Sequence, residues 1–128
     1  MKSIRIIILA SFGAFALQSC ETTTTPHDPQ KAYLHLQDGW NNDDVKIDID
    51  GIEVYHNDSV FTNNVLGLAD IDSTTQSYGT HEIKVDVNHG DIHTENFELH
   101  QTLWLGISLH YTDSSVHIMY STEPYMYD

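Results

Sequence analysis

Cysteine and permanent cations are scarce in this chain of 128 residues. Cys20 is the only cysteine, which excludes an internal disulfide and leaves packing to hold the fold. After residue 20 there is no arginine, and Lys31, Lys46 and Lys84 face all 19 carboxylates. Residues 20–128 therefore carry a formal charge of −16, which repels nucleic-acid phosphates and anionic lipid headgroups. We expect no nucleic-acid partner.

Motifs of the common enzyme mechanisms are also missing. The chain has no Gly-x-Ser-x-Gly elbow, no glycine-rich phosphate loop and no His-Glu-x-x-His zinc motif. Carboxylate pairs abound, but an acidic surface provides such pairs without any cleft for a substrate. We therefore expect a protein that is not an enzyme.

The first twenty residues have the pattern of an export signal. Lys2 and Arg5 precede an apolar run over 6–17, which is shorter than the roughly 20 residues of a membrane span. The run ends in Leu17-Gln18-Ser19-Cys20. This ending resembles the lipobox of bacterial lipoproteins. The resemblance implies that residues 1–19 are a signal peptide removed after Ser19, and that Cys20 carries a diacylglycerol anchor of the palmitate type.

Residues 20–30 lack a face that could be buried. They contain four threonines and two prolines, which is typical of an extended, flexible tether. The lipoprotein resemblance implies a lipid-anchored protein of the bacterial cell envelope that faces the periplasm. We place it in the outer membrane rather than the inner one, although Glu21, directly after the cysteine, does not decide between them.

The remaining chain shows no amphipathic helical period of useful length. Short alternating segments, separated by turn residues, instead predict strands at 32–37, 45–49, 52–56, 81–87, 92–100, 103–111 and 116–120. We predict that residues 31–128 form one all-β domain. Its expected architecture is a single antiparallel β-sandwich, immunoglobulin-like or transthyretin-like.

Asp50-Gly51 is the strongest hairpin signal in the chain. A two-residue loop there predicts that Ile49 faces Ile52, that Ile47 faces Val54, and that Val45 faces His56. The apolar side chains then share one face.

The segment 92–100 allows two registers. A tight turn at His89-Gly90 would place Ile92 toward the core. A longer loop or a bulge would bring Phe97 and Leu99 inward, and we prefer this second register because it buries two large apolar residues.

Two short motifs carry a second resemblance. Ile49-Asp50-Gly51 and Gly79-Thr80-His81-Glu82-Ile83-Lys84-Val85 are similar to motifs of PEGA-type and related immunoglobulin-like sandwich modules of the bacterial envelope. This resemblance supports the fold and implies no catalytic residue.

Nine histidines are the main candidates for metal chemistry. The last hairpin is expected to pair Tyr111 with Val116, which would place His110 directly opposite His117. Cross-strand neighbours lie about 4.5–5.5 Å apart at Cβ, so both imidazoles could reach one Zn²⁺ or Cu²⁺. His89 and His93, at another turn, form a second predicted pair. We otherwise expect no cofactor.

Aspartates in two loops offer a weaker alternative. Asp38, Asp43 and Asp44 gather in one loop, and Asp70 and Asp72 in another, where calcium could bind. Solvated turn aspartates are the more common outcome.

Aromatic residues suggest a binding surface. Trp40, Trp104, Tyr125 and Tyr127 could form a platform for a sugar ring or a partner protein. We therefore predict a membrane-anchored envelope protein that acts as a non-catalytic binding or assembly module for a protein or glycan. The alternative is a histidine-rich accessory protein that binds a divalent metal or responds to pH.

Overall fold

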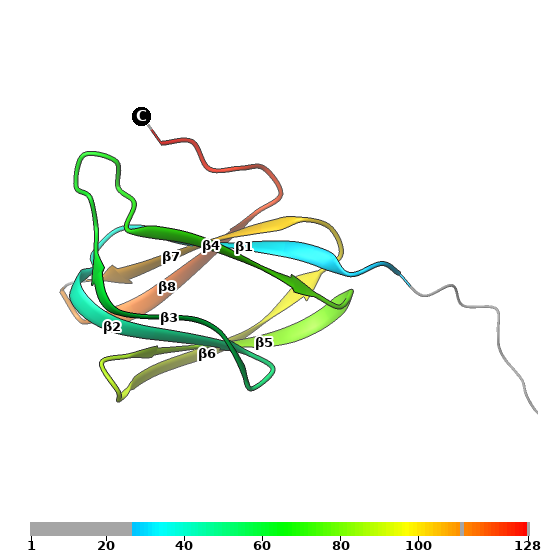
Figure 1. Cartoon of the computed structure of the whole chain (residues 1–128), viewed down its shortest axis with the longest axis horizontal. Helices are drawn as coiled ribbons and strands as arrows, with labels where there is room; N and C mark the ends of the chain where they lie inside the picture. Colours follow the sequence, from blue (N-terminus) through cyan, green and yellow to red (C-terminus); the bar gives the residue numbers. More distant parts are fainter. Residues whose placement is uncertain (1–26, 111, 128) are drawn as a thin grey trace, which may run out of the picture.

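The computed structural model describes residues 27–110 and 112–127, which form eight strands (Figure 1). The predicted signal peptide, Cys20 and most of the predicted tether lie outside the described residues. The strands are β1 (Gln30–Leu36), β2 (Asn41–Ile49), β3 (Ile52–Phe61), β4 (Asp70–Gln76), β5 (Gly79–Val87), β6 (Asp91–Leu99), β7 (Leu103–His110) and β8 (Ser115–Ser121).

The strands make two four-stranded sheets, ordered β4-β1-β7-β8 and β3-β2-β5-β6. Every strand pair is antiparallel except β1 with β7. The predicted all-β sandwich is thus confirmed. An immunoglobulin constant domain groups its first, second, fourth and fifth strands in one sheet, which differs from the order seen here.

The core lies between the two sheets and is aliphatic. Alternate residues of each strand point inward because side chains on a strand have a period of two. Burying each large side chain contributes roughly 1.5–3 kcal/mol. The fully buried side chains include Leu34, Leu36, Leu105 and Ile107 from one sheet and Val45, Ile47, Ile49, Ile83, Val85 and Leu99 from the other.

The Asp50-Gly51 hairpin is present, with a register that changes along its length. Both turn residues have positive φ, 53° and 80°, as a type I′ turn requires, and Ile49 faces Ile52 as predicted. Beyond the turn an irregularity in β3 places Tyr55, not Val54, opposite Ile47. The predicted pairing of Ile47 with Val54 is therefore wrong, because the bulge gives the core position to the larger tyrosine.

The preferred register of β6 is confirmed. Val87 pairs with Asp91 across a three-residue turn, so Phe97 and Leu99 are buried and Ile92 is exposed.

The predicted register of the last hairpin is wrong by two residues. Val116 pairs with Leu109, and His110 pairs with Ser115. Ser114 has a φ of 58° and donates its N–H to the His110 carbonyl at 2.6 Å. Residues 112–114 lie in the turn, whereas Tyr111, the predicted partner of Val116, lies outside the described residues.

A tyrosine–carboxylate hydrogen bond joins the two sheets at each open edge. Tyr55 on β3 donates to Asp70 on β4 at 2.8 Å, and Tyr120 on β8 donates to Glu95 on β6. Burial and the adjacent carboxylate raise the pKa of both tyrosines. The phenols therefore stay protonated and act as donors across both edges.

The strand directions define two ends of the sandwich. The chain enters β1 at the end that carries the Asp50-Gly51 turn, loop 77–78 and loop 100–102 (Figure 1). After β8 ends at that same end, the segment 122–127, called the tail below, passes over the outside of the β4-β1-β7-β8 sheet (Figure 1). Among residues 27–110 and 112–127 no helix is long and apolar enough to cross a membrane.

Candidate binding face

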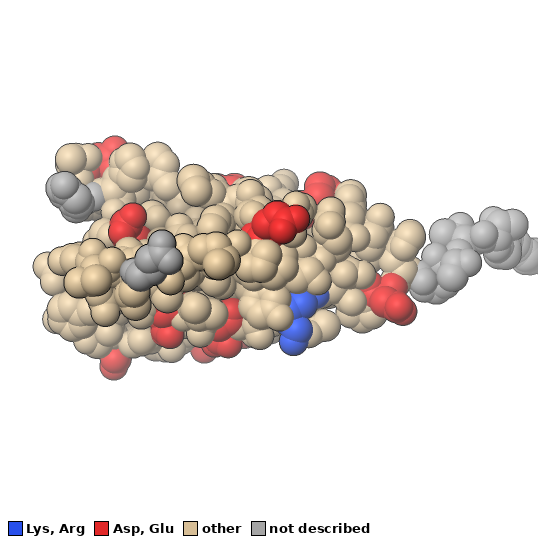
Figure 2. Space-filling view, turned by 90° about the horizontal axis from the view of Figure 1, so that it is seen from above, with Lys and Arg blue, Asp and Glu red and all other residues tan. Residues whose placement is uncertain are grey.

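The outer surfaces of the two sheets differ in charge. The β3-β2-β5-β6 sheet points Asp48, Lys46, Lys84, Glu82 and Glu98 outward, as the alternation of its strands requires. The outward positions of the β4-β1-β7-β8 sheet include no carboxylate, and Figure 2 shows tan over most of this side with separated red groups. These positions are Lys31, Tyr33, His35, Ile71, Ser73, Thr75, Trp104, Gly106, Ser108, His110, Ser115, His117, Met119 and Ser121. We call this surface the uncharged face, because it has no carboxylate and Lys31 is its single permanent charge.

An aromatic pair lies on this face. Tyr33 on β1 and Trp104 on β7 are register partners, and their half-buried rings stack with centroids 5.3 Å apart at 10°. Offset stacking of this kind stabilises by about 0.5–1.5 kcal/mol beyond area burial and fixes both rings. Trp104 is thus outward-facing, as the sequence predicts.

Gly106 makes a notch in the middle of the face. It lies on the central strand β7, between its register partners His35 on β1 and Met119 on β8. Tyr125 of the tail contacts both neighbours: its ring lies 5.7 Å from that of His35, and its hydroxyl donates to the Met119 carbonyl at 3.3 Å. The Tyr125 side chain therefore reaches across β7 at Gly106, where the lack of a Cβ leaves room for both Tyr125 and the neighbouring Gln37 side chain.

Tyr127 occupies the next part of the same surface. Its hydroxyl lies 2.8 Å from Nδ1 of His35 and accepts a hydrogen bond from the Gln37 amide at 2.9 Å. When His35 is neutral with its proton on Nε2, the hydroxyl donates to Nδ1 while it accepts from Gln37. Burial lowers the pKa of His35, which favours that neutral form.

Trp40 does not belong to this face. It is only 3% exposed, packs in the core and donates its indole N–H to the Ile107 carbonyl at 3.2 Å. This placement differs from the predicted surface platform. The chain crosses from one sheet to the other at this point, so a residue expected in a solvated loop covers the end of the core.

His110 and His117 meet, although not as direct partners. His117 pairs with Ser108, and the two imidazoles stack diagonally with ring centroids 3.8 Å apart at 14°. Ser115 lies 3.2 Å from Nε2 of His117 and donates to the carboxylate of Asp113. The hydroxyl and the backbone N–H of Ser115 both donate to Asp113, and these two bonds, followed by the two histidines, lower the pKa of Asp113.

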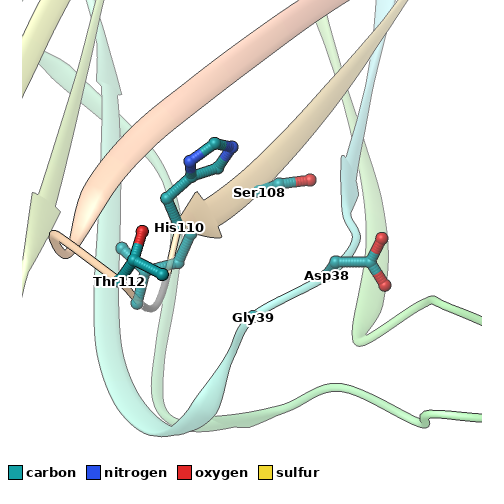
Figure 3. Close-up of a pocket in the computed structure, with 6 residues that line it drawn as sticks. Asp38, Gly39, Ser108, His110 and Thr112 are labelled. Atoms are coloured by element: carbon teal, nitrogen blue, oxygen red, sulfur yellow. The ribbon is translucent and has the colours of Figure 1, made fainter.

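A hollow lies beside this histidine pair. It has a volume of about 410 Å³ and is lined by residues of β7 and of two loops (Figure 3). Asp38 and Gly39 form one side, and Ser108 and His110 form the other (Figure 3). Its open, mixed lining contains no nucleophile paired with a base.

The second predicted histidine pair is not brought together. Nε2 of His89 lies 2.7 Å from Asp44, whereas Nε2 of His93 lies 2.6 Å from Glu95. Asp44 also binds His56, at 2.8 Å, so this carboxylate on β2 already has two imidazole partners. In the part of the chain that the structure describes, no three His, Cys, Asp or Glu side chains are grouped as a metal site.

Four members of the uncharged face that form the aromatic stack or contact the tail were not predicted as site residues: Tyr33, His35, Gly106 and Met119. Gln37, which lies beside this face and binds Tyr127, was not predicted either. Alternation in 32–37 already placed Tyr33 and His35 on the side away from the core. Their partners come from the parallel pairing of β1 with β7, which joins residues about 70 positions apart and leaves no local signal.

Comparison with known proteins adds no assignment. No protein-family model matches the chain, and neither a curated protein nor a solved structure shows significant similarity to it.

Proposed function

We propose that this protein is a lipid-anchored component of the bacterial cell envelope that acts as a non-catalytic binding module. The uncharged face is its binding surface, and the protein that it binds approaches over the Tyr33–Trp104 stack. The supporting observation is the charge asymmetry: a domain this acidic keeps every carboxylate off the outward positions of one sheet. Uncharged, aromatic surface of this kind is typical of interaction sites.

The position of the tether agrees with this role. His27, within the predicted tether, stacks on Tyr78 with ring centroids 3.9 Å apart, and Tyr78 stacks on His100 at 4.7 Å. These three rings hold the chain against the end at which β1 begins. A domain suspended from that end presents the uncharged face sideways along the membrane, where a partner has access.

Two matched charge substitutions test the proposal. Met119 on β8 is 59% exposed on the uncharged face, and Ile92 on β6 is 58% exposed on the opposite sheet. We expect the Met119→Glu variant to capture roughly tenfold less of the envelope partner from a solubilised membrane fraction than the unchanged protein does, because the new carboxylate has to be desolvated on contact. Ile92→Glu should capture as the unchanged protein does. Equal capture by both variants would reject the uncharged face as the binding surface.

The stacked His110 and His117 favour a second function, weak binding of Zn²⁺ or Cu²⁺. Two adjacent imidazoles supply two of the three or four ligands that a stable site requires, and solvent supplies the others. Calorimetry with Zn²⁺ should give a binding heat that His117→Ala removes and His100→Ala retains. Identical heats for the three proteins would end this alternative.

A further inference from the structure

The tail gives direct information on what the uncharged face accepts. Its two tyrosines are spaced two residues apart, and both lie on the sheet. The hydroxyl of each is hydrogen-bonded: Tyr125 to the Met119 carbonyl, and Tyr127 to His35 and Gln37. Met126, between them, points away and is 86% exposed. The sheet therefore binds the tail as an extended segment, through alternate side chains, as in the binding of extended peptides by other sheets.

The surface under the tail is built for this contact. Gly106 occupies the interior of a central strand, where glycine costs roughly 0.5–1 kcal/mol relative to alanine. A Cβ at this position would lie 2.6 Å from Oε1 of Gln37, the side chain that orients Tyr127. His35 is 6% exposed beneath the tail and presents Nδ1 to the phenol. The notch and its polar floor match a tyrosine side chain.

The tail is held by side chains alone. Among the described residues, no backbone–backbone hydrogen bond joins 122–127 to the sheet. Leaving the surface breaks the phenol hydrogen bonds and the ring contacts, and it restores the conformational freedom of six residues. A free segment with the same side chains can make the same contacts, but it competes with a tail that the chain holds at a high effective concentration.

We propose that the notch above Gly106 is a recognition site for extended peptide segments with two tyrosines spaced two residues apart, and that the tail is its resident occupant. The inference rests on the proposed function and names its partner class: a protein segment that presents two tyrosines at alternate positions, as the tail does. The partner displaces the tail and inherits its contacts with His35, Gln37 and Met119.

A peptide binding experiment tests the site. The probe is a fluorescein-labelled peptide with the sequence of residues 122–128, and its anisotropy is measured against the full chain and against a variant that ends at Ser121. The shortened variant should bind saturably, and the full chain at least about tenfold more weakly, because its own tail occupies the notch at a high effective concentration. A peptide with alanine in place of both tyrosines should not bind.

Two controls keep the result decisive. Gly106→Val in the shortened variant should abolish binding while its circular dichroism and cooperative unfolding stay those of a folded sheet protein. If the shortened variant does not fold, the full chain with Tyr125→Ala and Tyr127→Ala replaces it. A folded, tail-free protein that ignores the peptide, or that binds both peptides equally, overturns the inference. Retention of the Met119→Glu effect in that case would leave the proposed function standing, whereas loss of both results would overturn the two together.

Discussion

At the scale of single residues, His81 shows how a buried histidine is kept charged. Nδ1 lies 2.6 Å from the Asp50 carboxylate, and Nε2 lies 2.6 Å from the Ser77 carbonyl. Both partners are acceptors, so only the imidazolium satisfies both contacts. Burial acts to lower the pKa of His81, but the hydrogen bonds to Ser77 and Asp50 outweigh it and the pKa is raised. The same ring ties the Asp50-Gly51 turn to the β4–β5 loop.

The sign of the resulting pH dependence follows from this raised pKa. Below the ordinary histidine pKa of about 6.5 the contribution of His81 to the free energy of unfolding is fully present, and it is lost as pH rises through the higher folded pKa. We predict that His81→Gln destabilises by roughly 1–3 kcal/mol at pH 6, and by less as the pH increases. Urea unfolding between pH 6 and 9 measures this, and a deficit that grows with pH would contradict it.

The pH dependence that His35 gives to stability has the opposite sign. Burial lowers its pKa, so its contribution to stability is present above pH 6.5 and is lost as pH falls through the lower folded pKa. Because its neutral Nδ1 faces the Tyr127 hydroxyl, acid conditions also weaken the hold on the tail. Sequence alternation placed His35 outward, but the buried position of His81 was not predicted. Their partners come from other elements, which a local pattern does not identify.

At the scale of elements, the Asp50-Gly51 turn, whose two residues have positive φ, was the most predictable feature. Asp50-Gly51 fixed one hairpin, and the two apolar residues near the end of β6 selected its register. The errors arose in β3, where one extra residue before Tyr55 exchanges the two faces, and in the last hairpin, whose register shifts by two residues without exchanging them. The alternation alone marks neither shift.

Gly39 controls the passage from β1 to β2, where the chain changes sheets. Its φ is +91°, and a Cβ there would lie 1.7 Å from the backbone oxygen of Leu109. We predict that Gly39→Ala destabilises by about 2–4 kcal/mol, because backbone on both sides has to move. Gly90, with open space around its Cβ position and no positive φ, is the control, and Gly90→Ala should change stability by no more than about 0.5 kcal/mol. Thermal unfolding of the pair measures the contrast, and equal effects would show that the close approach is unimportant.

At the scale of the whole molecule, we propose a lipid anchor joined to a sandwich whose two outer surfaces differ in charge. The lipobox resemblance predicts that Cys20→Ser releases the protein from membranes, because the acyl chains bind through about 0.8 kcal/mol per buried methylene. Fractionation of cells, with mass spectrometry of the N-terminal peptide, measures this. Membrane attachment that persists in Cys20→Ser, or an unmodified thiol, would refute the anchor.

The sequence predicted the fold class and part of the candidate site. Trp104, Tyr125 and Tyr127 do gather on one surface, while Trp40 packs in the core and the histidines at 89 and 93 bind separate carboxylates. The charge asymmetry was not predictable from composition. It depends on which strands share a sheet, and therefore on the parallel pairing of β1 with β7.

Site-specific photo-cross-linking in intact cells tests the central claim most directly. A benzophenone amino acid replaces Met119 on the uncharged face or Ile92 on the opposite sheet, two edge positions of nearly equal exposure. The account predicts a discrete cross-linked product from position 119 and none from position 92. Cross-links that form from position 92 alone, or equally from both positions, would contradict it.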